Sequence, residues 1–461
     1  MNKNNKPKSN IKHITKIATL CFFLSIVTFV NITKFIYLSL FKSSKLGVIM
    51  FIRNIFNKLI GHSLYKNALW LILNSVVLSG FGFIFWSIAV RLYSASQVGL
   101  ASTLISSLEL ISMFSLLGFN IALVRYISKS KEKSSMISSC FGISGIVALF
   151  LSLIFVLFIK VFSPKLVFLK EIRLYSFLFA IFVLSYVFFT LIESVFIGFR
   201  KAKFVLIKNI IFSVLKLIFL FFLIFLGAFG IFSSMAISAL IAFFSISFFL
   251  GLKIRPVIKK GIVKKMFRFS LSNYIANSLR YAPAFILPLI ITNTINPETT
   301  AYFYIAMMIS NLLFIIPVST SNSLLAEGSY DINSLKENTK KSLKFSYLIL
   351  LPGVVFIWIF GNYLLLFFGR LYSENALILL KILSVSSIFF TINAVYISVM
   401  NIKHMIKKVV IINFLICSGI LIISYKLLGL GLVGIGIGWL IGQFIGNIFV
   451  IIDTIKSRGI L

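Results

Sequence analysis

The sequence predicts an all-α polytopic membrane protein with two six-helix lobes around a central cavity, related by pseudo-twofold symmetry about the membrane normal. Its composition, twelve apolar runs and an internal repeat predict this fold class. Of the 461 residues, 60% are hydrophobic and 12% are charged, whereas soluble domains average about 45–50% apolar and 25% charged residues. A soluble fold could not bury this much apolar surface, so the composition indicates a chain that faces lipid.

Twelve apolar runs follow Ala68, and each is long enough to span a membrane. A span of roughly 30 Å takes about 20 mostly apolar residues. The connections between the runs are short, so none of them can hold a separate soluble domain. The runs cover residues 68–90, 98–124, 136–162, 174–198, 204–226, 229–252, 269–291, 300–326, 343–368, 376–400, 406–428 and 432–452.

The excess of basic residues is explained by membrane topology. The chain has 45 Lys and Arg against 10 Asp and Glu, a formal charge of +35. In a soluble protein this balance would suggest nucleic acid, but here the cations lie mostly between apolar runs. They concentrate in the gaps after runs 2, 4, 6, 8 and 10, and the gap at 160–173 is the one clear exception. Because cytoplasmic loops carry the excess of Lys and Arg, both ends of the twelve-run core are expected in the cytoplasm of a multi-pass cell-membrane protein with no nucleic-acid partner.

Residues 1–64 form a basic lead-in that fits this topology less well. An extra apolar segment, Ile17–Val30, follows a Lys-rich start and would place that start outside if it crossed the membrane. Two explanations remain open. Either natural translation begins near Met50, or residues 17–41 lie in the membrane surface.

An internal repeat predicts that the twelve runs form two copies of a six-span unit. "LGAFGIF" at 226–232 and "LGLVGIG" at 430–436 are 204 residues apart, and the same offset pairs Asn209 with Asn413. An even number of spans brings both copies into the membrane from the same side, so their symmetry axis lies along the membrane normal. The predicted parts are a first lobe at 65–252, a basic cytoplasmic linker at 253–268, a second lobe at 269–452 and a cytoplasmic tail at 453–461.

Polar residues inside the seventh run share one helix face. Asn273, Asn277 and Arg280 are spaced i, i+4, i+7, and Arg280 is about 16 Å into the span at 1.5 Å per residue. A central Arg costs about 2.5–3.5 kcal/mol to insert even by low estimates, and a wet cavity would remove most of that cost. We expect these residues to line such a cavity. The alternative is an Arg that pairs with an acidic residue only to hold two helices together.

Two further runs carry the same spacing. Asn209, Ser213 and Lys216 lie on one face of the fifth run, and Glu109 ends a similar series in the second run. Deep cations at Lys216 and Arg280 around a shared cavity would suit an anionic substrate. Glu109 has three open roles: a proton or sodium site, a charge partner for one of these cations, or a helix-packing group.

The sequence gives no indication of an enzyme. Its three cysteines all lie in apolar stretches without zinc or disulfide spacing. It contains no nucleophile–base pair, metal cluster or phosphate-binding loop. We therefore expect no catalytic residues, no metal and no cofactor.

The stretch "YKNALWLILNSVVLSGFGFIFWSIAVRLYSASQVGLASTLISSLELISMFSLLGFNIALVRY" at 65–126 resembles the opening of polysaccharide-biosynthesis flippases. The residues that carry the likeness include Asn67, Gly82, Arg91, Tyr93 and the "LGFNIALVRY" ending. These flippases belong to a superfamily that also holds multidrug and toxin extruders and peptidoglycan-lipid flippases. The resemblance covers about residues 65–452, in order.

The resemblance implies a flippase that moves a lipid-linked oligosaccharide, a glycan on a polyprenyl phosphate or diphosphate, by alternating access. It also implies membrane lipids, and glycosyltransferases of the same pathway, as partners. The alternative is a drug/cation antiporter of the multidrug and toxin extrusion type, although no acidic pair of the kind expected there is present. The substrate-binding candidates are Arg280, Lys216, Asn273, Asn277, Arg91 and Asn209, with Glu109 as an ion-coupling or charge-partner residue.

Overall fold

A computed structural model of the protein describes residues 63–128, 130–249 and 258–456. The predicted N-terminal apolar segment and translation start, and the first residues of the predicted linker, lie outside the described residues. The chain divides into two compact units, Met1–Lys66 and Asn67–Leu461. All contacts described below lie within the second unit.

The predicted helical class and the twelve spans are confirmed. Twelve helices are long and apolar enough to cross a membrane, and the described residues contain no strand. The first lobe contains α3 (Ser63–Leu92), α4 (Ala95–Ser115), α5 (Phe119–Tyr126), α6 (Lys133–Leu157), α7 (Ile159–Phe162), η1 (Pro164–Leu166), α8 (Phe168–Glu171), α9 (Arg173–Gly198), α10 (Ala202–Phe222), η2 (Ile224–Leu226) and α11 (Ala228–Phe249). The second lobe contains α12 (Lys260–Thr294), α13 (Pro297–Tyr330), α14 (Leu335–Leu366), α15 (Arg370–Ile402), α16 (Ile406–Lys426), η3 (Leu428–Leu430) and α17 (Gly431–Lys456).

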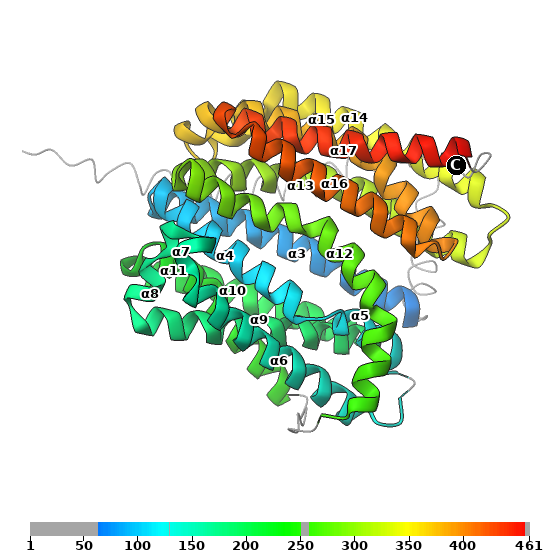
Figure 1. Ribbon diagram of the computed structural model, residues 1–461, viewed down its shortest axis with the longest axis horizontal. Helices are drawn as coiled ribbons and strands as arrows, with labels where there is room; N and C mark the ends of the chain where they lie inside the picture. Colours follow the sequence, from blue (N-terminus) through cyan, green and yellow to red (C-terminus); the bar gives the residue numbers. More distant parts are fainter. Residues whose placement is uncertain (1–62, 129, 250–257, 457–461) are drawn as a thin grey trace, which may run out of the picture. The chain divides into compact units, whose positions relative to one another are not determined.

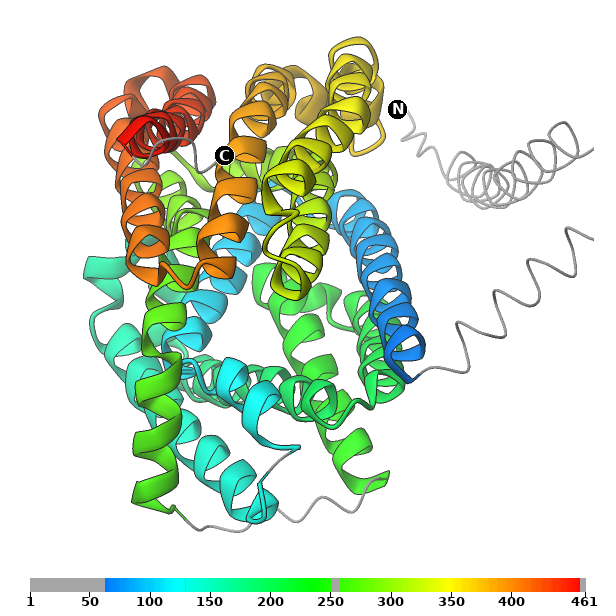
Figure 2. The same cartoon turned by 90° about the vertical axis from the view of Figure 1, so that its right-hand side faces the viewer.

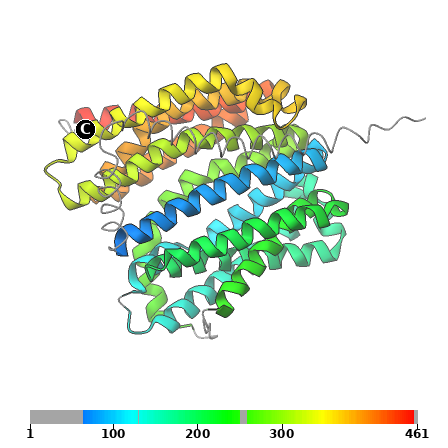
Figure 3. The same cartoon turned by 180° about the vertical axis from the view of Figure 1, so that it is seen from behind.

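The two lobes meet through a few helices near the middle of the bundle. α14 to α17 lie on one side and α6 to α11 on the other, with α3, α4, α12 and α13 between them (Figures 1 and 3). A quarter turn shows the same division (Figure 2). Packing between lobes runs mainly through α4 against α12 and α13, and through α5 against α12. Large apolar side chains such as Phe225 and Phe248 remain exposed, as expected of surfaces that contact lipid.

The second apolar run is not one continuous helix, contrary to the prediction of a single run at 98–124. α4 ends at Ser115 and α5 begins at Phe119, because Leu117 and Gly118 both have positive φ, 48° and 75°. A Cβ at Gly118 would lie 2.8 Å from the Ser270 Oγ of α12. Glycine therefore permits both the turn and the close approach of α12. The break brings α5 against the other lobe.

The repeat at an offset of 204 residues is confirmed in the backbone. α10 and α16 have equivalent bounds at this offset, and so do η2 and η3. Gly227 has φ 56° and ψ −129°, and Gly431 has φ 60° and ψ −138°. This region of φ/ψ space is open essentially to glycine alone. The same special geometry at equivalent places supports duplication of a six-span unit.

The second pair of repeated glycines is required by packing. A Cβ at Gly230 would lie 2.1 Å from the carbonyl oxygen of Leu223, and one at Gly434 would lie 1.9 Å from that of Leu427. These acceptors are themselves 204 residues apart. The tight return from η2 or η3 into the next helix thus depends on the same missing side chain in both lobes.

Replacing Gly434 by alanine is expected to destabilise the protein by roughly 1–3 kcal/mol, the usual cost of overpacking. The added methyl group has to displace backbone rather than a flexible side chain. The measurement is thermal unfolding of purified protein in detergent. Gly80→Ala is the matched control, since a Cβ there meets no atom within 4 Å. Equal unfolding temperatures for both variants would contradict the close packing.

Candidate functional site

Two neighbouring cavities lie where the lobes meet. The first, here called the inner cavity, has a volume of about 310 Å³ and is lined by α3, α4, α12 and α13. The second, the polar cavity, has a volume of about 410 Å³ and is lined by α4, α5, α9 and α12. Glu109 and Phe285 line both. Because each wall contains helices from both lobes, a bound molecule would contact both lobes at once.

Glu109 lies at the junction of the two cavities. Its side chain is partly buried, and its Oε1 accepts a hydrogen bond from the Tyr186 hydroxyl at 3.4 Å. Trp86 and Tyr304 line the inner cavity beside it, with ring centroids 4.6 Å apart. Within the described residues no cation forms an ion pair with Glu109. Its predicted role as a charge partner therefore finds no support, whereas an ion-coupling role stays a prediction.

The wall of the polar cavity is rich in hydroxyl, amide and aromatic groups. Glu109 is the one residue with a full charge among the described residues that line either cavity. Hydroxyls and amides both donate and accept hydrogen bonds, so the wall can serve a ligand that has many polar groups. The sequence did not single out most of these residues, although tyrosine, asparagine and serine inside apolar runs were the available signal. The polar lining residues are Glu109, Ser112, Asn120, Tyr186, Thr190, Tyr274, Asn277, Ser278 and Tyr281.

Asn277 lies on this wall, as predicted for a cavity residue, but Arg280 lies on the next face of α12. The lining residues of α12 run from Tyr274 to Phe285 at helical spacing. Arg280 points instead toward α15, where its guanidinium carbon lies 5.6 Å from the centroid of Phe390. No described carboxylate pairs with it. The alternative of an Arg that merely ties two helices through an acidic residue is therefore not observed.

Lys216 lies inside the first lobe rather than on the wall of either cavity. Its side chain is 7% exposed, and its Nζ lies 5.3 Å from the ring centroid of Phe85 and 5.0 Å from that of Phe212. The described walls of the two cavities include neither Lys216 nor Arg280. The structure thus does not bring the two cations to one cavity wall. Their roles in substrate binding remain predictions.

Asn209 and Asn273 also lie away from the lining residues. Asn209 is buried, and its Nδ2 donates to the Oδ1 of Asn74 at 2.8 Å. Its repeat counterpart, Asn413, donates to the carbonyl oxygen of Ala276 at 3.0 Å. Each Asn joins two helices of its own lobe, which favours helix packing over binding at Asn209. Asn273 is partly buried on α12.

A buried ion pair that the sequence did not reveal lies beside Asn209. Lys208 is fully buried, and its Nζ lies 2.9 Å from Oε2 of Glu193 and 3.0 Å from the carbonyl oxygen of Phe189. The same Nζ lies 3.3 Å from the Phe189 ring centroid. The signal was a Lys within the fifth apolar run and a Glu within the fourth. Their pairing depends on how α9 and α10 pack.

Several contacts close the gap between the lobes at the predicted outer end, and we call them the outer closure. The hydroxyl oxygens of Thr103 and Thr292 are 2.5 Å apart, and those of Thr292 and Thr300 are 2.7 Å apart. Gly99 lies so close to Pro297 that a Cβ would be 1.7 Å from the proline carbonyl oxygen. α4 of the first lobe is thus pressed against α12 and α13 of the second.

Arg91 and Asn293 extend the outer closure. The Nη2 of Arg91 donates to the carbonyl oxygen of Phe367 at 3.1 Å, and its guanidinium carbon lies 4.9 Å from that residue's ring centroid. Asn293 donates to the carbonyl oxygen of Phe162 at 3.1 Å and accepts from the Ser163 hydroxyl at 3.2 Å. Arg91 therefore links α3 to the end of α14. Its predicted substrate-binding role stays a prediction.

The family is shown by a match over most of the first lobe and part of the second. The family model described as "Polysaccharide biosynthesis protein" matches residues 64–325. The chain belongs to this family. Polysaccharide biosynthesis proteins are thus the class to which the twelve-span fold and its two cavities belong here. No curated protein matches the chain at a significant level.

Solved structures that resemble this polysaccharide biosynthesis protein share its fold at low identity. The structure described as "Lipid II flippase MurJ, inward closed conformation" is 15% identical, with a TM-score of 0.67, over 83% of this chain and 87% of that one. An inward-facing multidrug resistance MATE family transporter of the MOP superfamily is 18% identical, with a TM-score of 0.62, over 86% and 95%. A MOP superfamily transporter from Pyrococcus furiosus, described as having a binding pocket of reverse polarity, is 17% identical, with a TM-score of 0.60, over 88% and 98%. The chain is thus a multi-pass membrane protein with the two-lobe fold of this superfamily.

Proposed function

We propose that this protein is a flippase that moves a lipid-linked oligosaccharide across the cell membrane by alternating access. The observation that carries the proposal is a polar cavity walled by both lobes in a member of the polysaccharide biosynthesis family. A change in the angle between the lobes would alter every wall of that cavity. The domain boundaries and cytoplasmic termini predicted from the sequence, and glycosyltransferase partners, form part of the proposal.

The cavity chemistry suits a glycan. Sugar hydroxyls both donate and accept hydrogen bonds, and Asn277, Asn120 and Thr190 offer matching groups. Tyr186, Tyr274 and Tyr281 add aromatic surface with polar ends. Glu109 can accept bonds from hydroxyl groups, and such charge-assisted bonds are stronger than neutral ones.

The outer closure gives the transport cycle a starting state. Contacts between the lobes block the predicted outer end, whereas the polar cavity lies along α5, which the topology places near the cytoplasmic end. A substrate from the cytoplasmic leaflet would reach the polar cavity first. Opening of the outer closure would then release it on the other side.

One observation favours the second candidate, a drug/cation antiporter. Glu109, a carboxylate, is the charged residue on the described cavity walls, and a carboxylate attracts cationic ligands. The family match weighs against this alternative. Transport assays with a cationic dye distinguish the two, since a glycan flippase should not move the dye against a gradient.

Loss of the protein in its source organism is expected to leave lipid-linked glycan in the cytoplasmic leaflet and to remove it from the cell surface. Asn277→Ala should lower the rescued surface glycan about tenfold, since a lost hydrogen bond costs on the order of 1 kcal/mol. Ser418→Ala is the control because that exposed serine bonds only to its own helix. Normal surface glycan without the protein would refute the proposal.

A further inference from the structure

A groove continues from the polar cavity toward the predicted cytoplasmic end. Its volume is about 480 Å³, and it shares the lining residues Asn120 and Ile121 with the polar cavity. Because the inner and polar cavities share Glu109 and Phe285, the three spaces form one series from the groove into the bundle. The groove is lined by Asn120, Ile121, Val124, Arg125, Ser194 and Phe269.

Arg125 is the cation of this groove, and aromatic rings hold it in place. It lies in the last turn of α5, with its guanidinium carbon 4.2 Å from the ring centroid of Phe269 on α12. Tyr126 packs edge-on against the same ring, with centroids 5.1 Å apart. A guanidinium that faces a ring keeps its N–H groups at the edge, where they can bind an anion. Within the described residues no carboxylate pairs with Arg125.

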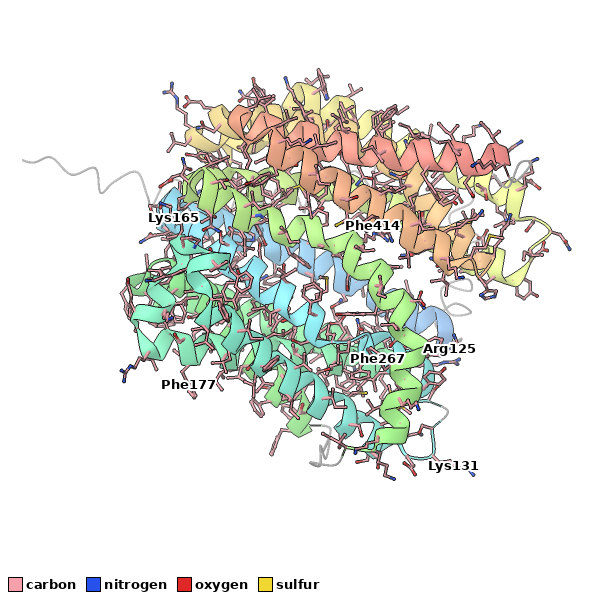
Figure 4. The ribbon with its side chains drawn as sticks, in the orientation of Figure 1. Arg125, Lys131, Lys165, Phe177, Phe267 and Phe414 are labelled. Carbon is pink, nitrogen blue, oxygen red and sulfur yellow. The ribbon has the colours of Figure 1, made fainter. Side chains whose placement is uncertain are left out.

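The position of Arg125 fits the depth of a lipid phosphate. Figure 4 shows Arg125 beside α12 and at the same end of the bundle as Lys131, whereas Lys165 lies at the opposite end. A polyprenyl tail stays in the hydrocarbon, so the phosphate attached to it lies near the membrane surface. The groove is formed by α5 and α9 of one lobe and α12 of the other. It can therefore hold a phosphate while the attached glycan extends into the polar cavity.

We propose that the groove binds the phosphate or diphosphate of the lipid carrier, with Arg125 as its forked donor. Arg pairs with phosphate through two parallel N–H bonds, which Lys cannot form. Asn120 and Ser194 supply an amide and a hydroxyl on the same wall. This inference rests on the proposed function and moves the phosphate site from the predicted Arg280 and Lys216 to Arg125. It also accounts for a polar cavity whose described walls carry no cation.

The test is binding of polyprenyl monophosphate and diphosphate to the purified full chain in detergent. Arg125→Gln should weaken binding at least about tenfold, because a hydrogen bond to a charged group contributes roughly 1.5–3 kcal/mol. Arg125→Lys should bind with intermediate affinity. Phe269→Leu, which removes the stacked ring but keeps the guanidinium, should weaken binding less than Arg125→Gln. Lys203→Gln is the matched control, since it removes an exposed charge on α10 outside the groove lining.

Each outcome decides the inference. Unchanged affinity in Arg125→Gln, or no binding of either phosphate by the parent protein, overturns it. Equal and Arg125-dependent binding of phosphatidylglycerol overturns the assignment to the carrier and indicates a phospholipid headgroup. Equal binding of uncharged polyprenol also overturns it, because the phosphate would then contribute nothing. The proposed function fails separately, if removal of the protein leaves glycan on the cell surface.

Discussion

A disulfide between Thr103→Cys and Thr292→Cys is expected to abolish transport. Their hydroxyl oxygens are 2.5 Å apart in the outer closure, one on α4 and the other on α12. Both residues are fully buried, so the new sulfurs would face each other in a packed site. If the lobes separate at this end during each cycle, a covalent bond there halts the cycle at the outward step. Transport of glycan into the outer leaflet should fall to background.

A second cysteine pair provides the matched control. The hydroxyl oxygens of Thr320 and Ser346 are 2.6 Å apart, but both residues belong to the second lobe, on α13 and α14. A disulfide at Thr320→Cys and Ser346→Cys should leave transport intact, because these helices are expected to move together. The parent for both pairs would have Cys21, Cys140 and Cys417 replaced by alanine.

Reduction decides what the cross-link does. A reducing agent should restore transport in the Thr103 and Thr292 variant, which separates locking from misfolding. Each single cysteine variant should transport at close to the parent rate. Full transport by protein that is cross-linked between the lobes would show that this end does not open, and alternating access about the outer closure would then be wrong.

Span number and the repeat could be predicted from the sequence because each depends on local chemistry. Apolar length decides whether a helix can cross a bilayer. The repeat was visible because Gly227 and Gly431 need positive φ, and Gly230 and Gly434 need a missing Cβ. Such positions keep their glycine wherever the backbone geometry is the same.

The wall of the polar cavity could be predicted only in part. Helical spacing shows that Asn273, Asn277 and Arg280 lie near one another, but not which neighbour each one faces. In the structure Asn277 faces the other lobe, and Arg280 turns toward Phe390 of its own lobe. The break at Leu117 and Gly118 also had little local signal, since a leucine at positive φ is set by packing against α12. Tertiary contacts decided both.

The buried pair of Lys208 and Glu193 shows the same limit, and it leads to a prediction on stability. Glu193→Gln is expected to destabilise the first lobe by about 3–5 kcal/mol, the usual result of leaving one member of a buried pair uncompensated. Lys208 is fully buried, whereas the side chain of Glu193 is 31% exposed. The ammonium group would keep only the Phe189 carbonyl oxygen and ring. Thermal unfolding in detergent measures the loss.

A double variant separates the pair from other causes. Lys208→Met removes the buried charge, so Lys208→Met combined with Glu193→Gln should recover much of the stability lost in Glu193→Gln alone. The exposed pair of Lys341 and Glu337, with both side chains 70% exposed, is the control: Glu337→Gln should leave the unfolding temperature unchanged. If Glu193→Gln unfolds at the parent temperature, Lys208 does not depend on that carboxylate. Because burial of the ammonium group creates that dependence, the asymmetry between the two single variants would measure how deeply the charge lies within the lobe.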